Sequence, residues 1–268
     1  MTIRAHWPQS LPGRVWRGSP TPAETTFRRN LALPFLAALC ALALCCPMAP
    51  GQTPLFEESP YDQITLDAKN ENKVIRVYPM DLPGRRVPDP LPRGKLEVQL
   101  LEEPGKKYEL FWNSVAKVEL FHDLVLQKAD ELVRARELEE AYEYFIFLLD
   151  ADPELPGLDR GIENYLYEEA KASQRQGHYD EALSMLREVY HRNAKRPGLD
   201  NALGLVTEKL VEKYVEADNY WTARRMLVNL EALYPGHPVV DKWEGRFKQE
   251  AADLLAEGRE AAKAGRLR

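Results

Sequence analysis

The chain has 268 residues, of which 44% are hydrophobic and 29% are charged, and this composition predicts a globular protein with one or two cores. The formal net charge is −6, and residues 1–51 hold five arginines and one acid, so the remainder is more acidic than the whole. A surface of this sign is unsuited to the phosphate backbone, and we expect no nucleic-acid partner.

The first 51 residues indicate export. Residues 1–27 are rich in Pro, Arg and Trp and lack periodicity, which predicts a disordered extension. Arg28 and Arg29 then precede an apolar run, and Pro47 to Gly51 follow it with small and helix-breaking residues. This order is typical of a secretory signal peptide cleaved after Gly51. We therefore expect a periplasmic or cell-envelope location.

The apolar run itself extends from Leu31 to Cys46. It is interrupted by Pro34 and is shorter than the ~20 residues that a membrane-spanning helix needs, so an uncleaved anchor is the weaker alternative. The run holds all three cysteines, Cys40, Cys45 and Cys46, so nothing after it can form a disulfide or a cysteine-based metal site. A lipid on Cys45 or Cys46 is a further alternative, although the preceding Leu44 is bulkier than lipoprotein signals favour.

Residues 52–113 are expected to form a small β subdomain. Four β-type runs occur there, at Ile64–Leu66, Val74–Tyr78, Leu96–Leu101 and Tyr108–Trp112. Between the second and third lies a stretch with four prolines in ten residues, Pro83–Pro92, which predicts an extended loop. The subdomain would be marginal alone, so it is expected to pack on the first helix through the apolar residues between Val115 and Phe121.

Residues 114–268 have a helical pattern. Apolar residues recur at helical spacing, and Gly, Asp and Pro mark the ends of the segments. We expect seven helices, at 118–135, 137–151, 156–176, 178–194, 197–217, 219–234 and 238–264.

A repeat of 41 residues runs through this region, from Leu138 to Asp241. Six columns align in one register: Leu138, Tyr179 and Tyr220; Ala141, Ala182 and Ala223; Phe145, Leu186 and Leu227; Leu148, Val189 and Leu230; Pro156, Pro197 and Pro238; Asp159, Asp200 and Asp241. Proline and aspartate in a first turn start one long helix, and the other columns form the apolar face of a second. Since one pair cannot bury its apolar face alone, the pairs are expected to stack. The predicted fold is mainly α, an α-solenoid of antiparallel helix pairs with a curved inner surface, preceded by the small antiparallel β subdomain.

The second helix of each pair resembles the tetratricopeptide repeat. The resemblance rests on the pattern Gly177-x-Tyr179-x-x-Ala182-x-x-x-Leu186 and on Leu138, Ala141 and Phe145 with Pro153 twelve residues after the alanine. It covers residues 118–268. The period of 41 exceeds the family's 34 by seven residues, which two extra turns in the first helix would absorb, and the family's Trp and Leu-Gly are missing. The resemblance implies a tetratricopeptide-like scaffold that binds a protein or peptide on its inner surface.

A narrower resemblance connects the β segment to the repeats. Tyr61–Leu66, Tyr78–Pro88 and Val118–Phe121, followed by the helical units, are similar to the region ahead of bacterial family 5 extracellular solute-binding domains of peptide-type ABC transporters. This resemblance implies ABC transporter components as partners and solute-binding lobes beyond Arg268. Gly265-Arg266-Leu267 repeats the pattern of Gly177-His178-Tyr179, and a truncated chain is accordingly expected. Cell-envelope assembly lipoproteins built from similar repeats are the alternative match.

Motifs for catalysis and metal binding are missing from the exported part of the sequence. It contains no phosphate loop, nucleophile elbow or zinc motif. Asp150, Asp152 and Glu154 open like a calcium loop, but Leu155 and Gly161 stand where Gly and a carboxylate are needed. We expect no cofactor, no metal and no catalytic residue. The alternative is an enzyme at the junction of sheet and helices that uses Arg85 and Arg86 with nearby acids.

The residues expected to contact a partner lie on the long first helices, out of phase with the apolar stripe. They are Asn164, Tyr167, Lys171, Glu208 and Glu212. The function predicted from the sequence is therefore that of an exported, non-enzymatic scaffold for a protein or peptide, with the solute-binding protein as its narrower version.

Overall fold

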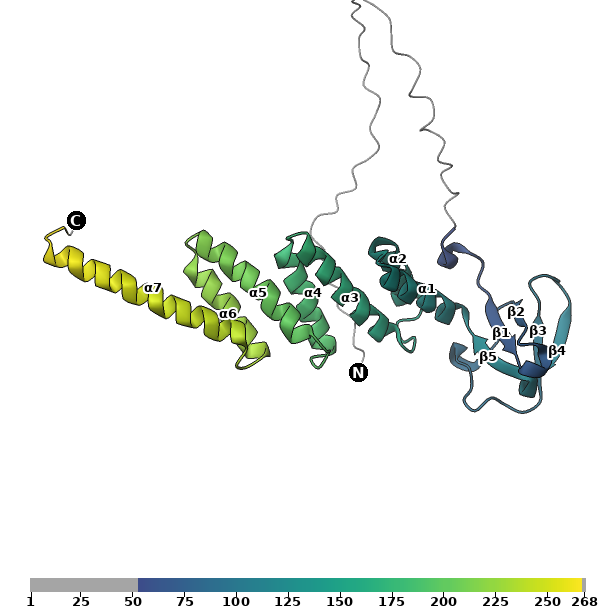
Figure 1. The fold of residues 1–268 in the computed structure, drawn as a ribbon. Coiled ribbons are helices and arrows are strands. Elements are labelled where there is room, and N and C mark those ends of the chain that lie inside the picture. The colour runs from purple at the N-terminus through teal and green to yellow at the C-terminus, as the bar shows by residue number, and fades with distance from the viewer. Residues whose placement is uncertain (1–52, 267–268) are drawn as a thin grey trace, which may run out of the picture. The chain divides into compact units, whose positions relative to one another are not determined.

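The computed structural model describes residues 53–266 of the chain. The chain divides between Glu58 and Ser59 into two units, and of the first unit the described part contains one short 3₁₀ turn, Leu55–Glu57. The predicted signal peptide, 1–51, lies outside the described residues. The second unit begins at Ser59 and contains five strands followed by seven helices (Figure 1).

The strands form two small antiparallel groups. Strands β1 (Asp62–Leu66), β2 (Val74–Val77) and β5 (Val115–Glu119) make a sheet in the order β2-β1-β5, and β3 (Lys95–Gln99) pairs with β4 (Lys107–Phe111). A bridge between Val77 and Leu100 connects the two groups. The predicted antiparallel β region is confirmed.

The core of the β region is built from residues that alternate along these strands. Its buried members are Ile64, Val77, Met80, Leu82, Val98, Trp112, Val115 and Leu120. Because successive strand residues point to opposite faces, every second side chain enters this core and its neighbours remain more exposed. With so few strands the core is small, and it needs the helices that follow for further cover.

Strand β5 differs from the prediction, which placed a subdomain boundary after Asn113 and began the first helix at 118. The strand continues the sheet to Glu119, and the helix begins at Phe121. The register against β1 shifts between Thr65 and Leu66, so Leu66 faces Val115 while Thr65 faces Lys117. This bulge breaks the two-residue alternation and makes Val115 and Val118 look like helical spacing.

The seven helices lie close to the predicted ranges. They are α1 (Phe121–Ala135), α2 (Leu138–Ala151), α3 (Leu158–Arg175), α4 (Tyr179–Arg192), α5 (Leu199–Glu216), α6 (Tyr220–Leu233) and α7 (Pro238–Lys263). Helices α1 with α2, α3 with α4, and α5 with α6 pack as pairs, and each pair also contacts the next. The chain is thus mainly helical, as predicted. Among the described residues, no helix combines the length and the apolar character needed to cross a membrane.

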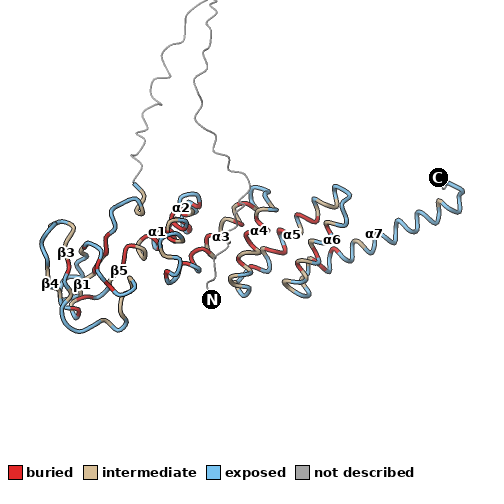
Figure 2. The backbone as a smooth tube through the Cα atoms, turned by 180° about the vertical axis from the view of Figure 1, so that it is seen from behind, coloured by how far each residue is buried: buried red, intermediate tan, exposed pale blue. Residues whose placement is uncertain are grey.

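The 41-residue period governs where the helices begin and end. Helices α2, α4 and α6 each start and stop 41 residues after their predecessor, and α3 and α5 start 41 residues apart. The three alanines of the second helices, Ala141, Ala182 and Ala223, are fully buried, at 0% exposure. The columns of Phe145 and Leu148 are buried in all three units as well (Figure 2). A small side chain at the alanine position lets the two helices of a pair approach closely.

The turn inside each pair also recurs with this period. Arg136, Gly177 and Asp218 have φ values of 64°, 82° and 53°, in the left-handed region. The residue after each donates its backbone N–H to the carbonyl five positions earlier, at 2.8–2.9 Å. This is the Schellman arrangement, which satisfies carbonyls at a helix end and reverses the chain.

Candidate functional site

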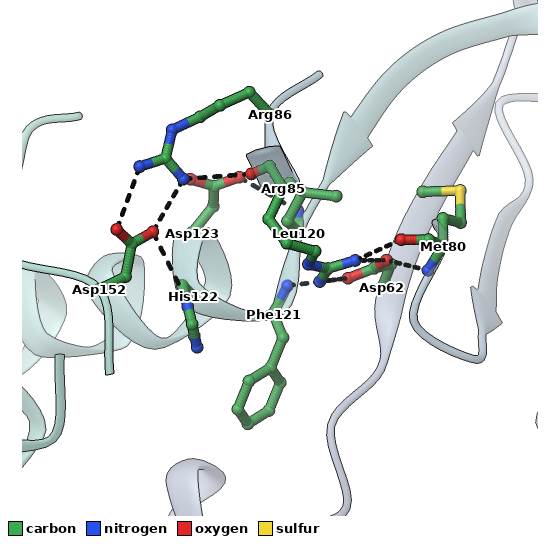
Figure 3. Close-up of polar contacts among 9 residues, drawn as sticks. All are labelled: Asp62, Met80, Arg85, Arg86, Leu120, Phe121, His122, Asp123 and Asp152. Carbon is green, nitrogen blue, oxygen red and sulfur yellow. Dashed lines mark hydrogen bonds and ion pairs between the residues drawn. The ribbon is translucent and has the colours of Figure 1, made fainter. Parts of the chain in front are cut away.

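The junction between sheet and helices is organised by one buried carboxylate, Asp62 of β1 (Figure 3). Its side chain is 0% exposed. It accepts hydrogen bonds from the backbone N–H of Met80 at 2.7 Å and of Phe121 at 3.0 Å, and Arg85 donates two more at 2.9 and 2.7 Å. Four donors saturate the carboxylate, and the bond to Asp62 raises the pKa of Arg85. Asp62 therefore ties β1, the loop after β2 and the start of α1 together.

The adjacent arginine, Arg86, points to the helices instead. It donates to both carboxylate oxygens of Asp152, at 2.8 and 3.1 Å, and to the backbone carbonyl of Glu154 at 3.1 Å. His122 lies 3.7 Å from the same carboxylate (Figure 3). The paired hydrogen bonds from Arg86 lower the pKa of Asp152 and keep it ionised. Arg86 thus fastens the proline-rich loop to the end of α2.

Asp123 lies beside this pair and has the opposite electrostatic character. Burial raises its pKa, against the lowering effects of the Leu120 N–H and the charge of Arg86. Its side chain accepts the Leu120 N–H at 3.1 Å, so it caps the start of α1. The carboxylate is held near the positive end of the helix despite the cost of its burial.

The junction has the charged groups that an enzymatic site would require, and each has a structural partner. Arg85 and Arg86 hold Asp62 and Asp152, and Asp123 caps a helix. Asp152, part of the calcium-like stretch, is bonded to an arginine. Among the described residues, no group of three His, Cys, Asp or Glu side chains is placed to hold a metal ion.

Three of the predicted partner-contacting residues gather around one arginine. Arg196, in the connection between α4 and α5, donates to Asn164 at 2.9 Å and forms a close ion pair with Glu163. Its guanidinium carbon lies 4.3 Å from the ring centre of Tyr167, and Lys171 lies 5.4 Å from the same ring. Tyr167 also donates to the carbonyl of Gly198 at 3.4 Å. These residues, the Arg196 cluster, link α3 to the beginning of α5.

The other two predicted residues, Glu208 and Glu212, lie on α5 and do not join this cluster. Glu208 forms an ion pair with Lys242 of α7, and Glu212 accepts from Lys209 one turn away at 2.7 Å. The structure therefore places Tyr167 and Glu208 where one first helix meets the next. The prediction that these residues contact a partner stays a prediction.

The Arg196 cluster and the Arg86 pair occupy equivalent places in successive units. His122 faces Asp152 in one unit, and Glu163, 41 residues on, accepts from Asn193, which lies 41 residues after Asp152. In the next unit Gly204 stands at the equivalent position, and a β-carbon there would lie 2.3 Å from the ring of His237. Arg196 was not predicted as a site residue, because its only signal was its place before Pro197.

Another surface of the first helices shows residues spaced for a common face. On α3 these are Asn164, Glu168, Lys171 and Arg175; on α5, Leu205, Lys209, Glu212 and Glu216; on α7, Arg246, Glu250, Asp253 and Glu257. Their spacing of four, three and four residues puts each set on one side of its helix. Leu205 is 47% exposed among these polar neighbours. We call this set the first-helix surface.

Comparison with models of known protein families, with characterised proteins and with experimentally solved structures finds no match.

Proposed function

We propose that the chain is an exported, non-enzymatic scaffold that binds a protein or peptide on the first-helix surface of a tetratricopeptide-like solenoid. The observation that carries this proposal is the 41-residue recurrence of helix bounds, turns and buried columns. Repeated helix pairs that contact only their neighbours produce an extended binding surface rather than an enclosed site.

Contacts between successive first helices support a continuous surface. Gly161 of α3 lies against Leu126 and Asp130 of α1, since a β-carbon there would be 3.2 and 3.3 Å from their side chains. Tyr167 connects α3 to the start of α5, and Glu208 connects α5 to α7. The four first helices are therefore joined in sequence.

The chemistry of this surface favours a peptide with an apolar anchor and basic neighbours. Leu205 supplies an exposed apolar contact in the middle, and the acids increase from α3 to α7, where Glu250, Asp253 and Glu257 follow one another. A few anchors of this kind carry most of the affinity in helix-in-groove and extended-peptide recognition.

The engagement of the junction arginines supports the non-enzymatic part of the proposal. Arg85 and Arg86, the groups that the enzyme alternative requires, are committed to Asp62 and Asp152. A catalytic role would need them to leave partners that hold the β region to the helices.

Capture of partners from the cell envelope with matched variants tests the binding surface. A partner retained by the wild-type chain and by Ser184→Glu, on the exposed face of α4, is expected to be lost with Leu205→Glu. A partner that Leu205→Glu retains, or a chain that retains none, would contradict the proposal. Circular dichroism of each variant checks that the helices are unchanged.

Export is a separate part of the proposal and rests on the sequence of residues 28–51 alone. Mass spectrometry of the mature chain from the envelope fraction is expected to find Gln52 as the first residue. A lipid on Cys45 or Cys46 would favour the envelope-lipoprotein alternative, and an intact Met1 in the cytoplasm would contradict export.

A further inference from the structure

An apolar groove lies between the start of α6 and the second half of α7. It has a volume of about 400 Å³, and Tyr220, Phe247, Ala251 and Leu254 form its apolar part. The rings of Tyr220 and Phe247 meet edge to face with their centres 5.9 Å apart. Leu254 is 69% exposed, so the groove leaves a large apolar side chain open to solvent.

Acidic side chains surround this apolar floor. Glu250, Asp253 and Glu257 complete the lining of the groove. Arg246 forms an ion pair with Glu250 at 2.8 Å, which leaves the rim with more negative than positive charge. The groove therefore suits an apolar side chain that carries positive charges beside it.

A surface with this complementary chemistry exists on the same chain, on the outer side of α6. Trp221 is 70% exposed, and the guanidinium carbon of Arg225 lies 4.7 Å from its ring centre. Arg224 and Val228 are also exposed, one and two turns along the helix. We call these four residues the tryptophan patch.

The tryptophan patch departs from the pattern of the two preceding units. The positions equivalent to Trp221 are Glu139 and Asp180, both exposed and acidic. The position of Arg225 is Glu143 in one unit and Ser184 in the next. Two acidic or neutral columns thus become aromatic and basic in the third pair alone, beside a groove that is acidic.

We propose that a second copy of this chain occupies the groove, with the tryptophan patch of each copy docked on the α6–α7 groove of the other. Tyr220 and Trp221 are consecutive residues, so groove and patch lie side by side at the start of α6. Two complementary patches that adjoin on one chain can meet reciprocally about a two-fold axis, in the commonest form of homodimer. The proposal is independent of the partner bound by the first-helix surface around Leu205.

Tryptophan and arginine are the residues most enriched among those that dominate protein interfaces. Burial of the Trp221 ring supplies the apolar contribution, and Arg224 and Arg225 meet the acidic rim. Since the arginines and carboxylates are exposed before docking, added salt should weaken the dimer by screening them. We expect a dissociation constant in the micromolar range.

Sedimentation equilibrium of the full chain tests the anchor. Trp221→Ala is expected to raise the dissociation constant at least about thirty-fold, as loss of a central anchor does. Leu255→Ser is the matched control, because Leu255 is exposed on α7 but does not line the groove. Equal weakening by the two variants would indicate general association through α7 and overturn the proposal, as would a wild-type chain that stays monomeric in the millimolar range.

A charge exchange tests the pairing of the two surfaces. Arg224→Glu with Arg225→Glu is expected to abolish the dimer, and so is Asp253→Arg with Glu257→Arg. A mixture of the two double variants should form heterodimers, because each arginine surface then meets an acidic one. Failure of the mixture to associate, with both variants retaining the helical circular dichroism of the wild type, would contradict the proposed docking.

Discussion

At the junction of sheet and helices, single carboxylates hold segments that are far apart in the chain. Asp62 accepts from the backbone of both Met80 and Phe121, 18 and 59 residues away. These N–H groups stand at the ends of a strand connection and of a helix, where regular structure provides no acceptor. A fully buried carboxylate substitutes for that acceptor, and Arg85 compensates its charge.

Asp62→Ala should therefore be strongly destabilising. It leaves two backbone donors and a guanidinium without their acceptor, and we expect a loss of about 3–5 kcal/mol in the free energy of unfolding. Urea unfolding followed by circular dichroism measures this loss. Asp67→Ala, at an exposed cap of a 3₁₀ turn, is the control and should lose about 1 kcal/mol or less. Similar values for the two variants would contradict the role given to Asp62.

Asp152 should make stability depend on pH in the acid range. Its folded pKa lies below the usual value of 3.8 because Arg86 donates to it, so its contribution is fully present above pH 3.8. The contribution is lost as the pH falls through the lowered folded pKa. With Arg86 partly exposed and screened, we expect Asp152→Asn to cost about 1 kcal/mol at neutral pH and to flatten the acid loss.

Asp123 provides the opposite sign for the same titration. Its raised folded pKa means that stability falls as the pH rises from 3.8 towards that value. Asp123→Asn should consequently change the slope in the opposite sense to Asp152→Asn. Parallel slopes for the two variants, measured as unfolding free energy against pH, would refute the assignment.

Gly204 owes its presence to a close neighbour. A β-carbon there would meet the His237 ring at 2.3 and 2.6 Å, and His237 caps α7 by accepting the Val239 N–H at 3.2 Å. Gly204→Ala should thus lower stability by about 1–3 kcal/mol through overpacking, although alanine is the better helix former.

The sign of this effect should reverse when the histidine is removed. In a His237→Ala background, Gly204→Ala is expected to stabilise by up to about 1 kcal/mol, since only helix propensity remains. Unfolding curves of the two single variants and the double variant measure the coupling. Destabilisation by Gly204→Ala in both backgrounds would show that another contact excludes the β-carbon.

Between the helices of a pair, the turns share one geometry but carry different residues. Gly177 adopts positive φ without strain, whereas Arg136 and Asp218 adopt it with a side chain. Asp218→Gly should therefore stabilise the chain by about 0.5–1 kcal/mol, since relief of the left-handed strain exceeds the entropy that glycine adds to the unfolded chain. Thermal unfolding measures the shift, with Gly177→Ala as the control of opposite sign; destabilisation by Asp218→Gly would contradict the shared geometry.

The repeated helices could be predicted from the sequence because their determinants are local. Ala141 and Phe145 lie on one face of one helix, and the same spacing recurs 41 residues later. Strand β5 could not, because its bulge depends on pairing with β1, more than fifty residues earlier.

The site was predictable only in part for a related reason. Asn164 and Tyr167 were recognised as polar or aromatic residues outside the apolar stripe, which is a property of α3 alone. Arg196 belongs to a connection, and its importance arises from contacts with residues about thirty positions away. Sequence periodicity contains no record of such contacts.

Across the described unit from Ser59 to Arg266, burial declines towards the last helix. The first column of the second helices shows it, since exposure rises from 8% at Leu138 to 46% at Tyr220. Helix α7 is buried only near its start, at Val240 and Trp243, and its second half is exposed on all sides (Figure 2). Stability in an array of units depends on contact with neighbours, so the end of α7 should be its least stable helix.

Hydrogen exchange should resolve this gradient within one chain. At low protein concentration the amides of residues 251–263 are expected to exchange nearly as fast as in an unfolded peptide, because a helix of this length without tertiary contacts is marginal in water. The amides of α4, whose Ala182 and Leu186 are buried, should exchange only on global opening. As concentration rises, docking of a second copy on the α6–α7 groove should protect residues 251–263 in the wild type but not in Trp221→Ala. Protection equal to that of α4 at the lowest concentration would mean that α7 is stabilised within a single chain, and the reason for exposing Leu254 would have to be sought elsewhere.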